Sequence, residues 1–268
     1  MTGRERTAIL LQGREIELEY EWITSDLADA PLIVFLHEGL GSAAVWGDWP
    51  AVLCRATGCR GLIYSRYGYG SSTPRPEGEP WPADYLGAEA REALPALLGA
   101  LGVDALRDKP ILFGHSDGGS IALQYAAAFP QAVRAIVVVA AHLLFTEEVG
   151  SQRISWMQHR YADSPLRRNL ASVHDYPDDV FRGWSELWLS DRFREWNIER
   201  CVPLIQCPVL AVQGAEDQYG TLDQLDRIAR LARNATRVVL ERCGHFPHAE
   251  QPAMLAEAVK NFLNKELS

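Results

Sequence analysis

A serine flanked by two glycines constrains the possible fold more than any other feature of this chain. Residues 114–118 read Gly-His-Ser-Asp-Gly, the pattern G-x-S-x-G. The preceding residues 111–113 are a short apolar run typical of a buried strand, and residues 119–129 have the apolar spacing of a helix. A serine at such a corner lies on a sharp turn, and its hydroxyl is exposed at the edge of a sheet. The context predicts that Ser116 is a nucleophile, although the bare pattern also fits an ordinary surface turn.

The size and charge of the chain narrow the classes of partner. Its 268 residues suffice for one sizeable domain with an inserted subdomain. With 26 Lys and Arg against 35 Asp and Glu, the formal net charge is −9, which argues against nucleic acid or a membrane surface as a partner. We expect a small-molecule substrate and water, and the sequence leaves the oligomeric state open. Because no apolar segment resembles a signal peptide or a membrane span, we predict a cytoplasmic protein.

The sequence indicates neither a metal nor an organic cofactor. The five cysteines have no metal-ligand spacing, and we expect reduced thiols packed as small apolar groups. The glycines at positions 68 and 70 resemble the start of a dinucleotide-binding loop. However, the following residues 73–76 read Thr-Pro-Arg-Pro, so no helix begins there to bind a phosphate.

Buried-strand patterns alternate with helical patterns along most of the chain. The apolar runs at residues 31–36, 61–65, 134–140 and 207–214 are typical of strands covered on both faces of a parallel sheet. Residues 143–200 break this alternation, since they contain four of the eight tryptophans among many charged residues. We therefore predict a doubly wound α/β fold with a mostly parallel sheet. Residues 1–142 and 201–268 form its core, and residues 143–200 form an inserted helical cap.

A weakly nucleophilic serine hydroxyl needs a base, and the base needs a third group to orient it. Asp217 follows the strand at residues 207–214, so its carboxylate is expected at the same sheet edge as Ser116. Glu216 is the alternative acid, and Asp217 could instead form an Asx turn or cap the next helix. His245 follows the last strand, and we favour it as the base over His248 because it lies nearer the strand end.

These motifs, in this order, resemble the α/β-hydrolase fold family. The resemblance rests on Gly-His-Ser-Asp-Gly at 114–118, Gly-Ala-Glu-Asp at 214–217 and Gly-His at 244–245. It implies an eight-stranded, mostly parallel sheet with an inserted helical cap, and a triad of Ser116, Asp217 and His245.

The resemblance also implies an oxyanion hole made of two main-chain N–H groups. In this family one N–H comes from a loop that begins His-Gly after an early strand, and here Glu38 replaces that glycine. We therefore expect Gly39 to be this donor, with Leu40 as the alternative. The second donor is expected to be the N–H of Asp117.

The side chain of Asp117 has two interpretations. The sequence Ser-Asp-Gly-Gly resembles the elbow of amino-acid-ester hydrolases of the valacyclovir hydrolase type, in which the acid after the nucleophile binds a substrate amino group. Asp117 could therefore pair with a cationic substrate group. Alternatively, it is an N-terminal carboxylate that stabilises the helix after the elbow.

The sequence thus predicts a serine hydrolase that cleaves a carboxylic ester of a small, largely apolar substrate through an acyl-enzyme intermediate. A carbon–carbon bond hydrolase, a thioesterase and a lactonase share the same constellation, and a non-catalytic hydrolase-like receptor could retain it. Expected substrate contacts are His37, Leu40, Trp156 and Trp184. His37 and His115 are also expected to support the loops around the site.

Overall fold

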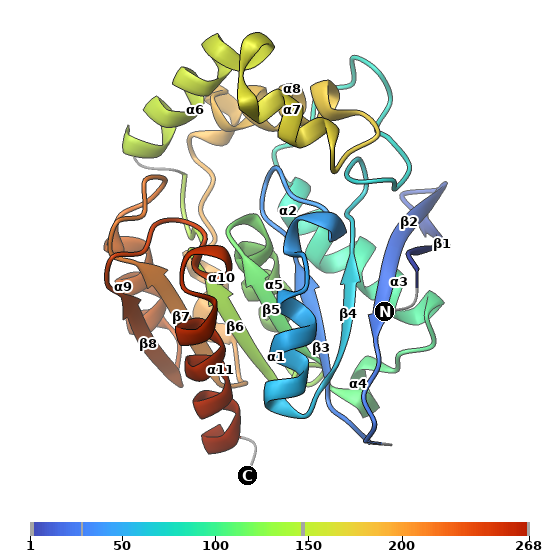
Figure 1. The fold of residues 1–268 in the computed structure, drawn as a ribbon, viewed down its shortest axis with the longest axis vertical. Coiled ribbons are helices and arrows are strands. Elements are labelled where there is room, and N and C mark those ends of the chain that lie inside the picture. The colour runs from blue at the N-terminus through green and yellow to red at the C-terminus, as the bar shows by residue number, and fades with distance from the viewer. Residues whose placement is uncertain (1–2, 28, 146–147, 267–268) are drawn as a thin grey trace.

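The computed structural model describes residues 3–27, 29–145 and 148–266, and its centre is one eight-stranded sheet. The spatial order of the strands is β1-β2-β4-β3-β5-β6-β7-β8 (Figure 1). β1 and β2 pair antiparallel, as do β2 and β4, and every other neighbouring pair is parallel. The strands are β1 Glu5–Leu11, β2 Arg14–Ile23, β3 Leu32–Leu36, β4 Arg60–Tyr64, β5 Ile111–His115, β6 Ala135–Val139, β7 Val209–Gly214 and β8 Ala235–Leu240.

Helices cover both faces of this sheet. The α-helices are α1 Trp49–Thr57, α2 Tyr85–Ala88, α3 Leu94–Ala100, α4 Ala105–Asp108, α5 Asp117–Ala128, α6 Glu148–Arg160, α7 Pro165–Ala171, α8 Pro177–Trp188, α9 Leu222–Leu231, α10 Pro247–Glu250 and α11 Pro252–Glu266. The shorter helical turns are η1 Ala43–Trp46, η2 Glu89–Ala93, η3 Tyr161–Asp163, η4 Asp191–Phe193 and η5 Glu199–Leu204. No helix in the described ranges has both the length and the apolar character needed to cross a bilayer.

The strands alternate their side chains between two buried cores. In β3, Ile33 and Phe35 pack into the core shared with α1 and α11. Val34 and Leu36 belong to the opposite core, which includes residues of α3, α5 and α9. All five residues of β3 are buried, because a strand in the middle of a parallel sheet has helices on both sides.

The segment between β6 and β7 lies over the end of the sheet at which the parallel strands terminate (Figure 1). It contains α6, α7 and α8, and within the described residues it contributes no strand to the sheet. Because the loops after β3, β5, β6, β7 and β8 reach the same edge, this segment and those loops face each other. This edge is where ligands bind in open α/β sheets.

The predicted fold class is confirmed, with two differences in detail. The sequence analysis did not predict β1, which pairs with the antiparallel strand β2 at the margin of the sheet. Residues 82–101 have the apolar spacing of one long helix, but the observed helix begins at Tyr85 and is interrupted by the π-helical turn η2 between α2 and α3. Pro95 lies in the first turn of α3, where its missing N–H is tolerated.

Candidate active site

Ser116 occupies the sharp corner between β5 and α5. Its φ of 53° and ψ of −116° are unusual for a residue with a side chain, and a conformation of this kind typically costs ~1–3 kcal/mol. The flanking glycines are needed for space. A Cβ on Gly114 would collide with the main chain of Gly118, and a Cβ on Gly118 would collide with the carbonyl of Leu36. The corner therefore holds the serine where the sequence pattern predicts it.

The side chains of Asp217 and His245 are hydrogen-bonded to each other. The Nδ1 atom of His245 lies 2.9 Å from both carboxylate oxygens of Asp217, and both side chains are buried. Asp217 also accepts a hydrogen bond of 2.8 Å from the main-chain N–H of Tyr219. Burial alone would raise the pKa of Asp217, but the hydrogen bond and charge of His245 outweigh it and lower the pKa. Since a carboxylate only accepts, Nδ1 carries a proton, and in the neutral form of the ring Nε2 of His245 is then an acceptor.

The alternatives to Asp217 and His245, which are Glu216 and His248, make different contacts. The side chain of Glu216 is exposed. His248 is buried against Trp46, with ring centroids 4.9 Å apart, and its burial together with the nearby His115 lowers its pKa to about 3. In the described part of the chain, no hydrogen bond links His248 to a carboxylate. The structure thus brings together Asp217 and His245.

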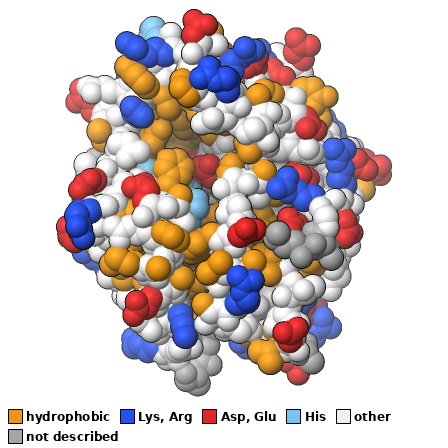
Figure 2. Space-filling view, viewed as in Figure 1, with side chains coloured by type: hydrophobic (Ala, Val, Ile, Leu, Met, Phe, Trp, Pro, Cys, Tyr) orange, Lys and Arg blue, Asp and Glu red, His pale blue; other side chains and the backbone are white. Residues whose placement is uncertain are grey.

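A cavity of about 370 Å³ lies between the sheet edge and the segment above it. Ser116 and His245 both line it, although no hydrogen bond connects their side chains among the residues described here. Such contacts are often long in structures without substrate. In Figure 2 hydrophobic side chains gather around a hollow beneath the α6–α8 segment. The lining side chains from that segment are mostly apolar: Ile154, Met157, Leu166, Leu170, Val173, Trp184 and Trp188.

The proposed oxyanion donors also lie at this cavity. Gly39, Leu40 and Asp117 line it, and within the described residues their main-chain N–H groups have no hydrogen-bond partner. Asp117 is the first residue of α5, so its N–H is one of those that a helix leaves unpaired. A Cβ on Gly39 would collide with the indole of Trp184. The geometry is compatible with either Gly39 or Leu40 as the first donor.

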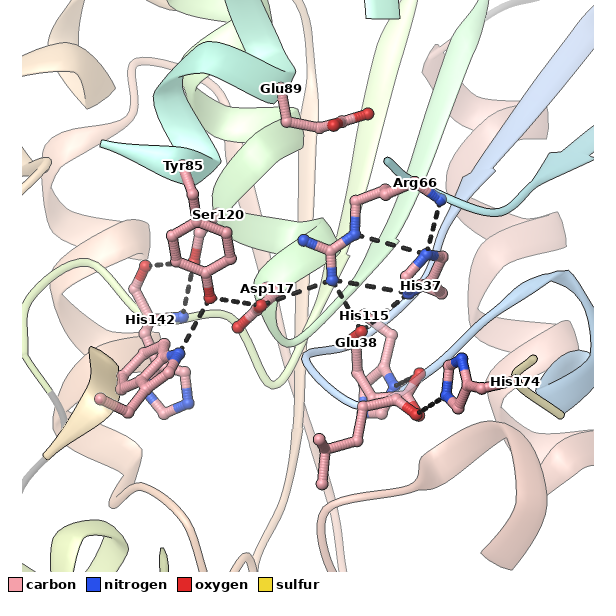
Figure 3. A network of polar contacts seen from close by, with 12 residues as sticks. His37, Glu38, Arg66, Tyr85, Glu89, His115, Asp117, Ser120, His142 and His174 are labelled. Atoms are coloured by element: carbon pink, nitrogen blue, oxygen red, sulfur yellow. Dashed lines mark hydrogen bonds and ion pairs between the residues drawn. The ribbon is translucent and has the colours of Figure 1, made fainter. Parts of the chain in front are cut away.

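The side chain of Asp117 is part of a buried polar network (Figure 3). Its Oδ2 accepts hydrogen bonds from the Tyr85 hydroxyl at 2.5 Å and from Nη2 of Arg66 at 3.4 Å. The indole N–H of Trp188 in turn donates to the Tyr85 oxygen at 2.9 Å. Burial raises the pKa of Asp117, whereas Arg66 acts to lower it. The carboxylate is therefore already paired within the protein, and it also lies in the first turn of α5, where a negative charge is favourable.

The four expected substrate contacts lie in different places. Leu40 and Trp184 line the cavity, whereas His37 and Trp156 do not. His37 is fully buried behind the loop, where its Nδ1 donates to the Glu38 carbonyl at 2.8 Å and its Nε2 accepts from the Arg66 N–H at 3.1 Å. Trp156 is 49% exposed on α6. The structure thus places two of these residues at the cavity and two away from it, because a loop residue can point into the core and an amphipathic helix has an outer face.

Three further cavity residues were not identified from the sequence. Glu38, His142 and Tyr219 all line the cavity. His142 lies three residues after the end of β6, at the same sheet edge that led to the prediction of Asp217. The rule that ligands bind beyond the carboxyl ends of parallel strands could therefore have identified it.

Curated proteins and solved structures resemble this chain. The human serine hydrolase BPHL is 32% identical over 163 residues, 56% of this chain and 50% of that protein, so the chain spans about half the length of that relative. A 2-hydroxy-6-oxo-2,4-heptadienoate hydrolase from Pseudomonas putida is 24% identical over 256 residues, 87% of this chain and 89% of that protein. A thermophilic esterase from Thermogutta terrifontis has the same fold, with a TM-score of 0.75, 18% identity and 100% of both chains covered.

The alpha/beta hydrolase family matches residues 33–258, which include the serine corner, the Asp217 loop and the His245 loop. The strand order and the similar solved structures agree with this match. This chain is therefore a member of the alpha/beta hydrolase family.

Proposed function

We propose that this chain is a serine hydrolase that cleaves a carboxylic ester of a small, largely apolar substrate. One observation carries the proposal: Nδ1 of His245 donates to Asp217 while His245 and Ser116 line the same cavity. In the neutral form of His245 this pairing makes Nε2 the acceptor nitrogen, and such a nitrogen is the base that a serine hydroxyl needs. The relatives named as a serine hydrolase and an esterase support the same reaction class.

The proposed reaction has two half-reactions. Ser116 Oγ attacks the ester carbonyl carbon, and its proton passes to Nε2 of His245. The bond to the alcohol oxygen then breaks, and that oxygen takes the proton and leaves an acyl group on Ser116. A water molecule next gives a proton to His245 and attacks the acyl carbon, and the serine oxygen recovers the proton as the acid departs. Asp217 keeps His245 in the required tautomer and stabilises its charged form.

The proposed oxyanion hole stabilises the negative charge on the carbonyl oxygen during both attacks. Its donors are the N–H groups of Gly39 and Asp117, with Leu40 as the alternative to Gly39. Each such donor typically accounts for ~10²–10³ in rate. The dipole of α5 adds to this stabilisation, because the helix begins directly after the nucleophile.

The composition of the cavity wall supports a neutral, apolar substrate. The wall contains Glu38 and Asp117 but no arginine or lysine among the described lining residues. A substrate carboxylate would meet no cation among these lining residues, and Arg153 lies behind the wall against Tyr219, so the lining itself disfavours dienoate substrates such as that of the Pseudomonas putida relative. We also propose that residues 143–200 act as the cap, since α8 supplies Trp184 and Trp188 to the cavity wall.

The test compares turnover of p-nitrophenyl acetate with turnover of a vinylogous diketone by the wild type and by Ser116→Ala. We expect sustained multiple turnovers of the ester, labelling of Ser116 by a fluorophosphonate probe, and loss of both in Ser116→Ala. Turnover of only the diketone would replace the proposal with carbon–carbon bond cleavage. Labelling without repeated turnover would instead favour a hydrolase-like receptor.

A further inference from the structure

His142 places an imidazole in the cavity that the proposed reaction does not use. Its side chain lines the cavity with Ser116 and His245, and only 5% of the residue is exposed. The ring centroids of His142 and His245 are 6.3 Å apart, and the His142 ring also packs edge-on against Trp188 at 5.5 Å. The imidazole of His142 is therefore close enough to the proposed base His245 that one small substrate group can contact both rings.

The elbow helix fixes the main chain of His142 relative to the nucleophile. The hydroxyl of Ser120, one helical turn after Ser116, donates to the His142 carbonyl at 2.6 Å and accepts from the His142 N–H at 3.3 Å (Figure 3). Gly220 lies against the other side of the ring, since a Cβ there would approach its Cε1 at 3.2 Å. His142 is therefore held in place by the same elements that hold the proposed active site.

Both ring nitrogens of His142 lack a partner within the described structure. Nδ1 is buried and unpaired, and no hydrogen bond is formed by Nε2. Unpaired buried polar groups are rare, and they are often explained by function. Burial and the nearby His245 lower the pKa of His142 to about 4, so the ring is neutral near pH 7. A neutral imidazole offers one donor and one acceptor, which is what a hydroxyl group can pair with.

We propose that His142 is the specificity-determining residue of this cavity, and that it binds a hydroxyl group one or two bonds from the scissile ester. This inference rests on the proposed ester hydrolysis. Because the two ring centroids are 6.3 Å apart and both residues line the cavity, a substrate group next to the reacting carbonyl can contact the His142 ring. The hydroxyl therefore belongs next to the ester, on either the acyl or the alcohol portion.

The experiment measures kcat/KM by proton release for two pairs of esters. Ethyl 2-hydroxybutanoate against ethyl butanoate tests a hydroxyl on the acyl side. 2-Hydroxyethyl butanoate against propyl butanoate tests a hydroxyl on the alcohol side. We expect the wild type to prefer the hydroxylated ester in one pair by about 2- to 12-fold, the usual effect of one hydrogen bond to a neutral group.

Variants of His142 distinguish a loss of hydroxyl recognition from a general loss of activity. His142→Phe should abolish the preference, because it lowers kcat/KM for the hydroxylated ester more than for the plain ester, and only the hydroxylated ester loses a hydrogen bond. His142→Gln, which keeps a donor and an acceptor, should restore part of the preference. His159→Phe is the matched control, since His159 is exposed on α6, and it should keep the full preference. If the phenylalanine variant does not fold, His142→Leu takes its place.

The outcomes distinguish this inference from the proposed function. Ester hydrolysis that depends on Ser116 but shows no preference in either pair overturns the role of His142 alone. A preference that persists in His142→Phe, or equal losses on the plain and hydroxylated esters, also overturns it. Absence of any Ser116-dependent hydrolysis overturns the proposed function, and the inference with it.

Discussion

The Nε2 atom of His115 donates a hydrogen bond of 2.7 Å to the main-chain carbonyl of His245. The residue immediately before Ser116 therefore holds the loop that carries the proposed base, 130 positions further along the chain. Nδ1 of the same ring lies 3.7 Å from Oε2 of Glu38, which lines the cavity. At 3.7 Å the contact between Nδ1 and the carboxylate is too long for a hydrogen bond, so within the described residues it is a through-space contact that extends this buried chain.

Glu38 should stabilise the fold in a pH-dependent manner. Burial alone would raise the pKa of Glu38, but His115, His37 and His248 outweigh it and hold the pKa at about 2. A depressed pKa contributes stability above the ordinary value near 4.5, and this stability is lost as the pH falls toward 2. The difference in unfolding free energy between wild type and Glu38→Gln should therefore be large at pH 7 and shrink between pH 4.5 and pH 2.

Urea denaturation at pH 7, 4 and 3 measures this difference. Glu216→Gln is the control, because the side chain of Glu216 is exposed and should give almost no pH-dependent change. A difference between wild type and Glu38→Gln that stays constant over this range would contradict the lowered pKa of Glu38 in the folded protein.

Asp217→Asn should reduce kcat far more than it changes KM. An asparagine can donate toward Nδ1 of His245 and so favour the wrong tautomer, which typically lowers kcat by about 10⁴ when the geometry is intact. The matched variant Glu216→Asn alters the neighbouring acid and should keep activity within about twofold. The measurement is the steady-state kcat and KM of both variants on p-nitrophenyl acetate. If Glu216→Asn shows the larger loss, the orienting acid has been misidentified.

Asp117→Asn should impair a plain acyl ester and an amino-acid ester equally. The Asp117 carboxylate is already bound by Arg66 and Tyr85, so it has little capacity left to recognise a substrate cation. The substitution leaves the buried Arg66 without this counter-charge, which should lower the unfolding free energy by about 3 kcal/mol. Paired kinetics and thermal unfolding provide the test. A selective loss on the amino-acid ester would restore the cation-binding interpretation.

Gly39→Ala should reduce activity because the new Cβ would collide with the indole of Trp184. Either the loop or α8 must then move, and a displaced oxyanion donor typically costs ~10²–10³ in kcat. Gly99→Ala is the control: it adds the same methyl group in α3, where no atom lies within 4 Å. This variant should keep full activity and gain about 0.5–1 kcal/mol of stability. Equal activity of the two variants would show that the contact between Gly39 and Trp184 is unimportant.

Much of the fold could be predicted from local patterns. The fully buried run in β3 and the Gly-x-Ser-x-Gly corner are short-range features, because each depends on neighbours within a few positions. The strand β1 was missed because its residues are mostly exposed, so the sequence shows no clear apolar period. His37 was expected both to contact substrate and to support its loop; it bonds to the Glu38 carbonyl of that loop, but it lies away from the cavity because it also binds Arg66 from the loop of the next strand.

By itself, the sequence determined the α/β alternation, the sharp corner at Ser116, and the two candidates for each of its partners. Only the tertiary structure decided that Asp217 pairs with His245, that Arg66 neutralises Asp117, and that His142 enters the cavity. The physical reason is how far apart along the chain the interacting residues lie. Backbone propensities and side-chain periods act between close neighbours, whereas the two pairs join residues 28 and 51 positions apart, and they form only when crossover connections bring strand ends to one edge.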